Sequence, residues 1–581
     1  MDRELTALRL KRLVGKPPAF LWRRFWLELG ARWEELQVAW GWKRFELGPE
    51  AWDQARQRPW PLAHLADEPG FLERAEEARE QRVDLLGSGP LSLRPVDWHR
   101  DYRSGYVWPR RHIRRLQAAR TGAEVKFPWE LSRHQWLLPL GQAYRATGEE
   151  RYAQAARELL SGWIAHNPYA VGVNWAVAME PALRLVSWTC LFHLLSPSSA
   201  WADPAFRSDF LASLNAQAHY VASHLEYSDL NGNHYLAGAV GLIAAGVFFG
   251  RPRWKSRGLA ILRQELPRQV SRDGVDFEGS VAYHRFVLEL FSVGFLLAGE
   301  GDGTLAAMLD FYAACLRPDG SLPQLGDNDD GRVLPGFRLL SPAAVGSLGF
   351  PDGGYFVMRN QHDHVFIDCA PVGMAGRGGH GHNDCLSFEA ILLGCPLIVD
   401  SGTGCYTFDP ELRNRLRSTA AHNTPQLDDL ELNRFVHPRL LWVLRDDARP
   451  HLDRFETGRE RDLFRGWHTG YPGARPVRTL ELEHSSHTLR LVDEVEGRGP
   501  RRLSIPLHLH PAVECVRQDQ AVRLCCRGQA FELAWSGPGL TLEELPGPGF
   551  SPSYGVLEPN RKLVWSGEQL PARLEWSLRP A

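Results

Sequence analysis

The pattern of apolar residues changes part-way along the chain, and this change constrains the fold more than any other feature. From residue 127 to about 315, apolar residues recur at helical spacing in successive segments that are separated by turn residues. Consecutive helices on short connections pack as antiparallel neighbours, which predicts a helical array of the α/α toroid type. The predicted helices are Leu131–Ala146, Glu149–Ile164, Ala178–Leu195, Ala205–Glu226, His234–Phe249, Arg257–Leu266 and Ala282–Gly299.

After about residue 350 the segments become short, rich in β-favouring residues and separated by Gly, Pro, Asp and Asn. So many short strands predict a large antiparallel β-sandwich. The predicted strands are Tyr355–Met358, Val365–Ile367, Leu386–Leu392, Leu397–Asp400, Thr488–Val495, Leu503–Leu509, Ala521–Cys526, Phe531–Trp535 and Ala572–Leu578.

We therefore predict an α+β multidomain fold with three parts. Residues 1–90 form an N-terminal extension that packs on the toroid, residues 91–345 an incomplete α/α toroid, and residues 346–581 the β-sandwich. A chain of 581 residues is too long for one compact core, which agrees with such a division.

Composition narrows the class of protein. The 67 Lys and Arg nearly balance the 69 Asp and Glu, so overall charge gives no argument for binding nucleic acid. The longest apolar run, residues 236–250, is shorter than the roughly 18–20 residues that span a bilayer, so we predict no membrane span. Residues 23–36 can form an amphipathic helix, which we interpret as a packing face rather than a membrane anchor.

The nine cysteines contain no CxxC pair and resemble neither a disulfide framework nor a zinc ribbon. The N-terminal stretch has no clean apolar segment followed by a small-residue cleavage site, and we predict a cytoplasmic protein. The chain has 21 tryptophans, and aromatic side chains of this kind often line carbohydrate-binding clefts. We expect most of these tryptophans to lie in the core.

Two histidines lie in a glycine-rich turn at the start of a predicted strand. These are His380 and His382, and Asp400 and His422 follow downstream. Two imidazoles and a carboxylate suit zinc better than calcium, so His382, Asp400 and His422 are candidate ligands and His380 remains for another role. The alternative is that these histidines only form hydrogen bonds within loops.

Three further motifs lie at helix starts. Asn231 to Tyr235 could bind an anion at a helix N-terminus through Asn233 and His234, or Asn231 or Asn233 could simply cap the helix. Residues 273–284 end in a Tyr283-His284 pair. Glu180 and Arg184 are spaced as a stabilising helical pair beside Asn174 and Trp175, and Trp175 either stacks on a sugar ring or lies in the core.

These motifs together resemble the heparinase II/III-like polysaccharide lyases and the related alginate lyases. The resemblance rests on six stretches in the same order: Val125–Gln135, Gly172–Trp175 with Met179–Arg184, Asn231–His234, His380–Asp384, Val399–Gly402 and Ala421–Asn423.

The resemblance implies a toroid followed by a sandwich, and cleavage of uronic-acid-containing polysaccharides by β-elimination. It assigns Asn233, with His234, to the uronate carboxylate, Tyr283 to the proton shuttle and His380 to a second base. It also makes His382, Asp400 and His422 ligands of a structural zinc. We take Asn174, Trp175, Glu180 and Arg184 as substrate-binding residues.

We therefore predict a polysaccharide lyase that acts on an acidic polysaccharide or oligosaccharide, and we leave its oligomeric state open. The alternative is a non-catalytic protein of the same fold that binds acidic glycans or assists exopolysaccharide assembly. A hydrolase would need paired carboxylates, for which Asp273, Asp276 and Glu278 are the candidates, and this reading ranks last.

Overall fold

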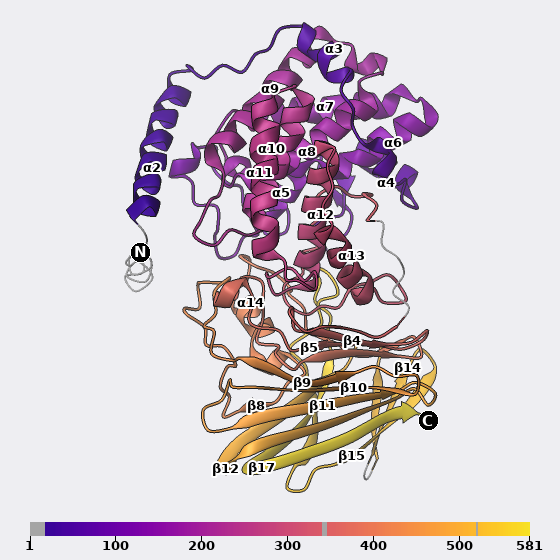
Figure 1. Ribbon diagram of the computed structural model, residues 1–581. Coiled ribbons are helices and arrows are strands. Elements are labelled where there is room, and N and C mark those ends of the chain that lie inside the picture. Colours follow the sequence, from indigo (N-terminus) through magenta and orange to yellow (C-terminus); the bar gives the residue numbers. More distant parts are fainter. Residues whose placement is uncertain (1–17, 340–345, 519–520) are drawn as a thin grey trace. The chain divides into compact units, whose positions relative to one another are not determined.

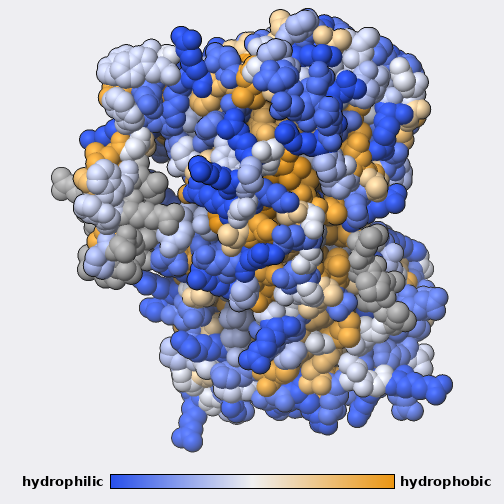
Figure 2. Space-filling view, turned by 45° about the horizontal axis from the view of Figure 1, so that its top comes forward, coloured by the Kyte–Doolittle hydropathy of each residue, from blue (hydrophilic) through white to orange (hydrophobic). Residues whose placement is uncertain are grey.

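The computed structural model describes residues 18–339, 346–518 and 521–581 (Figure 1). Contacts divide the chain into two compact units. Unit 1 comprises residues 1–265, 289–301 and 332–338, and unit 2 comprises residues 266–288, 302–331 and 339–581. Residues 266–288 and 302–331, which we predicted as part of the toroid, thus belong to the same unit as the β-strands. The division into three parts stays a prediction. Hydrophilic residues cover much of the face shown in Figure 2.

Unit 1 is helical, and its helices follow one another on short connections. Helix α10 is buried along almost its whole length, as expected for a helix that is apolar on all sides. The helices are α2 (Pro18–Ala39), α3 (Glu50–Arg56), α4 (Phe71–Arg79), α5 (Lys126–Arg133), α6 (Leu138–Thr147), α7 (Glu150–His166), α8 (Met179–Leu195), α9 (Pro204–His224) and α10 (Asn233–Phe248), and α11 (Pro252–Gln269) and α12 (Val281–Ala298) each belong partly to unit 1.

One predicted helix is two helices. The segment predicted as Leu131–Ala146 contains the end of α5, a short 3-10 turn and α6. His134 adopts a left-handed conformation with φ of 58°, which ends α5, and Pro139 lies in the first turn of α6, where a missing N–H costs nothing. Periodicity alone does not reveal such a break, since both helices bury apolar residues.

Unit 2 contains α13 (Thr304–Cys315), α14 (Pro410–Leu416) and two antiparallel sheets that form a sandwich. The smaller sheet has the order β3-β4-β5-β6-β7, and the larger has the order β13-β14-β15-β17-β12-β11-β10-β9, with β16 on β17 and β8 on β12. The strands are β3 (Leu348–Phe350), β4 (Tyr355–Arg359), β5 (His364–Asp368), β6 (Phe388–Leu392), β7 (Cys395–Ile398), β8 (Gln426–Leu427), β9 (Pro450–Glu456), β10 (Arg461–His468), β11 (Arg475–Glu483), β12 (Thr488–His508), β13 (Glu514–Arg517), β14 (Ala521–Cys526), β15 (Gln529–Ser536), β16 (Thr541–Pro546) and β17 (Arg561–Pro580).

The facing surfaces of the two sheets make one hydrophobic core. Phe388, Ala390 and Leu392 of β6 belong to the same buried cluster as Leu491 of β12 and Trp565 of β17. Alternate residues of β6 therefore share the face that is turned toward the large sheet. The opposite face of the small sheet is covered as well, because residues of β4 and β5 share a second buried cluster with α13.

The long strands of the large sheet departed most from prediction. The predicted strands Thr488–Val495 and Leu503–Leu509 are parts of one strand, β12, with register shifts between them. Strands β9, β10 and β11 were missed. All three contain several charged residues, which masked the strand signal, because β9 is largely exposed and β10 and β11 bury mainly one face.

Within the described residues, α12 alone is long and apolar enough to cross a membrane. Of its apolar window, 83% is buried inside the protein, which is usual for a core helix.

Helix α2 contacts the rest of unit 1 through a buried carboxylate. Glu34 accepts hydrogen bonds from Lys43 Nζ at 2.7 Å and Tyr169 Oη at 2.5 Å, and its other oxygen lies 2.7 Å from His224 Nε2. Burial favours the neutral acid, but the hydrogen bonds and charges of these partners, led by His224, outweigh it and lower the pKa of Glu34 to about 2.

Glu34→Gln is expected to loosen α2 in a pH-dependent way. Because the folded pKa lies below the ordinary carboxyl value, the stabilisation is complete above about pH 5 and is lost as the pH falls toward 2. Losing a charged hydrogen-bond network costs about 2 kcal/mol. Amide hydrogen exchange in α2 should therefore be faster in the variant at pH 7, and the difference should shrink below pH 4.5. Equal exchange rates at pH 7 would contradict this role.

Candidate active site

The glycine-rich turn at residues 378–381 brings an imidazole close to the backbone of other loops. Gly378 and Gly379 have positive φ values of 87° and 40°. A Cβ on Gly381 would lie 2.2 Å from the carbonyl oxygen of Val372, so only glycine fits there. The turn therefore holds His380 in a fixed position, as its sequence predicted.

His380 stacks on Tyr283. The two ring centroids are 3.5 Å apart and the rings are 13° from parallel. The Nδ1 atom of His380 lies 2.9 Å from Asp327 Oδ2, and its Nε2 atom is 3.5 Å from Glu278 Oε2, which is too long for a strong hydrogen bond. Donation from Nδ1 to Asp327 leaves Nε2 with a free lone pair, as a general base requires.

Tyr283 lies in the first turn of α12, and its hydroxyl group is close to the oxygen atoms of two other side chains. Its hydroxyl donates to Asp329 Oδ2 at 2.7 Å and is 3.4 Å from the hydroxyl of Tyr406. Burial, together with the carboxylates of Asp329 and Asp327, raises the pKa of Tyr283 well above its ordinary value. In this arrangement Tyr283 is a phenol with a proton to give.

Asp327 joins the two histidines of the turn to an arginine. It contacts Nδ1 of His380, Nε2 of His382 at 2.9 Å and Nη1 of Arg413 at 2.6 Å, and all of these side chains except that of His380 are completely buried. Burial alone raises a carboxyl pKa, but Arg413 and the two histidine hydrogen bonds hold the pKa of Asp327 well below its usual range. The site thus contains a permanent buried carboxylate.

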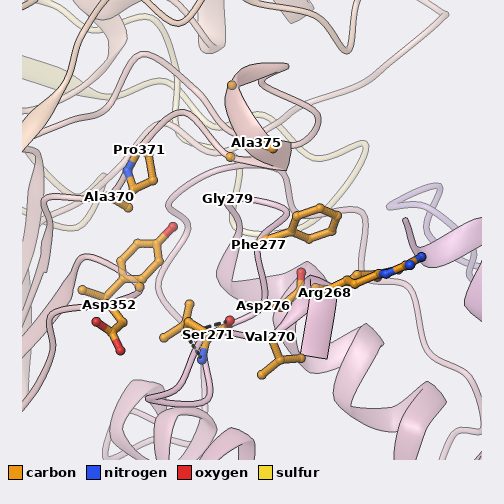
Figure 3. Close-up of a pocket in the computed structure, with 16 residues that line it drawn as sticks. Arg268, Val270, Ser271, Asp276, Phe277, Gly279, Asp352, Ala370, Pro371 and Ala375 are labelled. Carbon is orange, nitrogen blue, oxygen red and sulfur yellow. Dashed lines mark hydrogen bonds between the residues drawn. The ribbon is translucent and has the colours of Figure 1, made fainter. Parts of the chain in front are cut away.

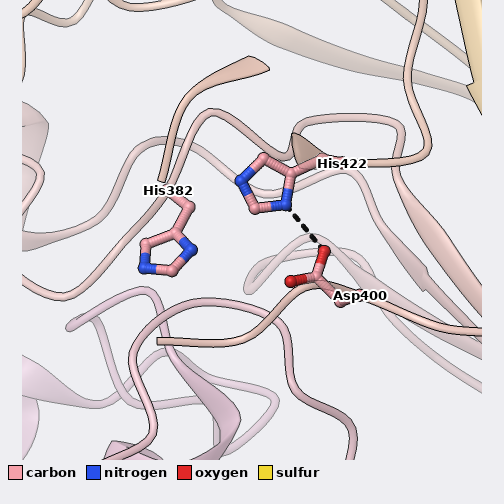
Figure 4. Close-up of side chains that lie close together, drawn as sticks. All are labelled: His382, Asp400 and His422. Atoms are coloured by element: carbon pink, nitrogen blue, oxygen red, sulfur yellow. Dashed lines mark hydrogen bonds and ion pairs between the residues drawn. The ribbon is translucent and has the colours of Figure 1, made fainter. Parts of the chain in front are cut away.

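The predicted metal ligands do come together (Figure 4). One ligand atom from each of His382, Asp400 and His422 lies within 4.8 Å of the other two, and all three residues are buried. His422 Nδ1 is 2.7 Å from Asp400 Oδ2. In the described part of the chain, His382 Nδ1 and His422 Nε2 are buried nitrogens with no hydrogen-bond partner.

The donor set of this cluster fits a metal ion. If His382 Nε2–H donates to Asp327, then Nδ1 is the unprotonated nitrogen and can act as a ligand, and the same reasoning frees Nε2 of His422. Two such nitrogens and a carboxylate oxygen are a combination that binds zinc in proteins. Burial disfavours the charged forms of both Asp400 and His422. Their mutual attraction outweighs this effect, so the pKa of Asp400 is lowered and the pKa of His422 is raised.

A cavity of about 300 Å³ lies next to the histidine turn (Figure 3). Phe277 and Gly279 line it, on either side of Glu278 in the sequence. A Cβ on Gly279 would approach Gly381 Cα at 3.2 Å, so the two backbones are in close contact. Burial and the neighbouring Glu278 raise the pKa of Asp276, another residue of the lining, well above its usual value.

The carboxylates considered for hydrolysis have structural partners. Asp276 accepts the N–H of Glu278 at 3.0 Å, and Asp273 accepts those of Asp352 and Gly353.

Asn233 and His234 lie at the start of α10 in unit 1. The predicted capping by Asn231 or Asn233 is wrong, because Gly232 is the N-cap residue and no side chain caps the helix. Asn231 instead donates to Glu265 at 3.0 Å. His234 Nδ1 contacts Glu226 at 2.9 Å while its side chain remains 41% exposed, so one face of the imidazole is open.

Of the predicted substrate-binding residues, all four are buried inside unit 1. Trp175 is 1% exposed and packs with Trp163, Tyr169 and Tyr220, so no ring face is open to a sugar. Asn174 donates to the carbonyl oxygen of Trp98. These contacts support the core interpretation of Trp175 over the direct contact with substrate that we expected.

The predicted Glu180–Arg184 pair is also wrong. Glu180 forms a bidentate ion pair with Arg133 at 2.8 and 2.9 Å, whereas Arg184 donates to Gln217 and to the carbonyl oxygen of Asn174. Helical spacing permitted the pair, but Arg133 reaches Glu180 from another helix with better geometry.

Sequence reasoning missed Asp327, Asp329, Tyr406 and Arg413. The first two lie in Gly326-Asp327-Asn328-Asp329-Asp330-Gly331, a dense polar turn between the last predicted helix and the first predicted strand. That density was an available signal. Tyr406 and Arg413 carry no local signal, because only the fold brings them to the turn.

Two sequence models of the heparinase II/III family match the chain. The heparinase II/III N-terminal model matches residues 96–332, and the heparinase II/III-like C-terminal model matches residues 344–576. The chain belongs to the heparinase II/III family.

Similar proteins include two named heparin-sulfate lyases. The one from Bacteroides stercoris is 27% identical over 489 residues, which are 72% of this chain and 70% of that protein. The one from Pedobacter heparinus is 25% identical over 426 residues, 65% of this chain and 61% of that protein.

Solved structures of the family share the fold. A crystal structure of heparinase III has a TM-score of 0.70 at 18% identity, covering 91% of this chain and 88% of that one. Another heparinase III structure has a TM-score of 0.63 at 22% identity with the same coverage. The predicted fold class, an incomplete α/α toroid followed by an antiparallel β-sandwich, is confirmed.

Asp327→Asn is expected to destabilise unit 2 strongly. It leaves Arg413 as a buried charge without its carboxylate, which costs about 3–5 kcal/mol. Urea unfolding followed by circular dichroism measures this loss. Asp429→Asn is the matched control, because Asp429 pairs with Arg502 at the surface with a side chain that is 71% exposed, and such pairs contribute about 0–1 kcal/mol. Equal stability of the two variants would contradict the role of Asp327.

Proposed function

We propose that this protein is a polysaccharide lyase that cleaves a uronate-containing acidic polysaccharide by β-elimination. Its membership of the heparinase II/III family and its heparin-sulfate lyase relatives support the reaction class and a glycosaminoglycan as substrate. The observation that carries the proposal is the stacked pair of Tyr283 and His380, each oriented by its own aspartate.

The chemistry requires one group to remove a proton and another to give one. The proton on C5 of the uronate leaves, the bond from C4 to the glycosidic oxygen breaks, and a C4–C5 double bond forms. The departing oxygen must gain a proton. The intermediate carries extra negative charge next to a carboxylate, so that carboxylate must be neutralised by hydrogen-bond donors.

His380 is the group that removes the C5 proton in this proposal. Asp327 accepts the Nδ1 proton, which fixes the tautomer with a basic Nε2 and stabilises the imidazolium that forms. Tyr283 gives its phenolic proton to the glycosidic oxygen, since the raised pKa keeps the phenol protonated before reaction.

We assign neutralisation of the uronate carboxylate to Asn233, with His234. An amide and an imidazole at the first turn of α10 add donors to the free N–H groups of the helix N-terminus, which favour an anion. These roles come from the family resemblance and remain part of the proposal.

We also propose that His382, Asp400 and His422 hold a zinc ion that is structural. A zinc ion supplies a fixed point that ties the histidine turn to the loops carrying Asp400 and His422. Asp327 then serves both histidines of the turn, orienting His382 as a ligand and His380 as a base.

Tyr283→Phe is expected to abolish most of the activity. Incubation of the wild type with a uronate polymer should raise ultraviolet absorbance as unsaturated ends form, and the variant should be slower by about 10²–10⁴-fold. Tyr106→Phe, outside the cluster, should match the wild type. Full activity of Tyr283→Phe on every cleaved substrate would show that the tyrosine is not the proton donor. Saturable binding of the polymer by the wild type without any unsaturated product would favour the non-catalytic alternative.

Removing the proposed zinc ion should lower both the metal content and the thermal stability of the protein. Elemental analysis of the purified protein should find about one zinc per chain, and His422→Gln should lower that content. A chelator should lower the thermal midpoint of the wild type but not of the variant, because a ligand at 100 times its Kd stabilises by about 2.7 kcal/mol. A metal-free wild type with an unchanged midpoint would contradict the zinc assignment.

A further inference from the structure

Helix α2 and the residues after it display an aromatic surface that the lyase reaction does not use. Trp22, Trp26, Leu29, Trp33, Leu36 and Trp40 follow one another at alternating steps of four and three residues, so they lie along one face of the helix. These six side chains are between 39% and 62% exposed, and Trp42 is 58% exposed. We call this set, with Leu21 and Phe25, the aromatic stripe.

The aromatic rings of the stripe and Trp42 pack against one another. Trp22 packs against Phe25 and Trp26 at 5.9 and 5.6 Å, and Trp42 packs against Trp33 and Trp40 at 6.1 and 4.5 Å. Single exposed apolar residues are common on protein surfaces, but a contiguous apolar surface on an exposed helix indicates an interaction site.

Three glutamates outside the stripe attach α2 to other residues of unit 1. Glu34 is buried among Lys43, Tyr169 and His224, and Glu35 contacts Arg115 at 2.5 Å. Glu28 contacts Arg114 at 2.6 Å. The helix, shown in indigo in Figure 1, therefore contacts the rest of unit 1 through glutamates, while the aromatic residues of the stripe are exposed. An amphipathic helix that served only to pack would be oriented the other way.

The charge of this region differs from that of the rest of the chain. Residues 1–45 contain ten Lys and Arg against five Asp and Glu, and three of those five acids contact basic groups of unit 1 or Lys43. The chain as a whole has a net charge of −2, so the region is basic within an otherwise acidic protein. A basic segment attracts an anionic surface, with a contribution of about 1 kcal/mol per Lys or Arg near it.

We propose that the aromatic stripe docks the protein onto an anionic lipid surface, with α2 lying in the plane of the headgroups. Trp dominates the stripe, and an indole has an apolar body with a polar N–H that suits the boundary between headgroups and acyl chains. The combination of aromatic residues on one face with basic residues nearby is that of interfacial helices. Aromatic residues also occur at protein interfaces, so it is the excess of basic residues in this segment that favours an anionic lipid surface over a protein partner or a second copy.

Flotation with lipid vesicles tests this proposal. The full-length protein should associate with vesicles of phosphatidylcholine and phosphatidylglycerol, and less with vesicles of phosphatidylcholine alone. Combined Trp22→Ser, Trp26→Ser and Trp33→Ser changes should lower the partition coefficient about tenfold or more, because burying one large apolar side chain already contributes about that factor. Brominated lipids should quench tryptophan fluorescence in the wild type and much less in the variant.

Val516→Ser combined with Leu557→Ser is the matched control. Both residues are exposed apolar side chains of unit 2 at 55% and 42%, and their loss should leave vesicle binding unchanged. Failure of the wild type to float with anionic vesicles would overturn the proposal. So would equal binding by the triple variant, or light scattering that shows a dimer lost in the triple variant without vesicle binding. None of these readouts depends on polysaccharide cleavage.

Discussion

The carboxylate of Asp327 is the interaction on which the candidate site depends. It is completely buried, and it stays ionised because Arg413 and two imidazoles surround it. A buried carboxylate of this kind is stable only while all its partners are present, since an unpaired charge in the interior is costly. Its four-residue network therefore fixes the positions of His380 and His382 together.

This shared carboxylate explains how one turn can have two roles. His380 and His382 are two residues apart, and their side chains reach different oxygens of Asp327. One imidazole then stacks on Tyr283, and the other belongs to the cluster with Asp400 and His422. The proposed proton-transferring pair and the proposed metal ligands thus share one anion, and a change in either one is expected to affect the other.

The sequence predicted the parts of the site that are carried by local motifs. The glycine turn and the candidate ligands His382, Asp400 and His422 could be argued from the residue types and their order in the sequence. The role of Tyr283 came from the family resemblance and stays a prediction. The strands of the small sheet and most helices were also predictable, because their apolar spacing reflects burial on one side. What local motifs could not reveal is that residues 327 and 413 converge on one carboxylate–guanidinium pair, since 86 residues separate them. For the same reason Trp175 and Arg184 were assigned to substrate, although long-range contacts with Trp163 and Gln217 place them in the core.

The proposed reaction is β-elimination. Whether oxygen from the solvent enters the products tests this reaction most directly. Cleavage of a uronate polymer in water labelled with heavy oxygen, followed by mass spectrometry, distinguishes elimination from hydrolysis. Elimination breaks the bond between C4 and the glycosidic oxygen without adding water, so we predict unlabelled products that include an unsaturated uronate end. Products that carry one heavy oxygen per cleavage would contradict the account.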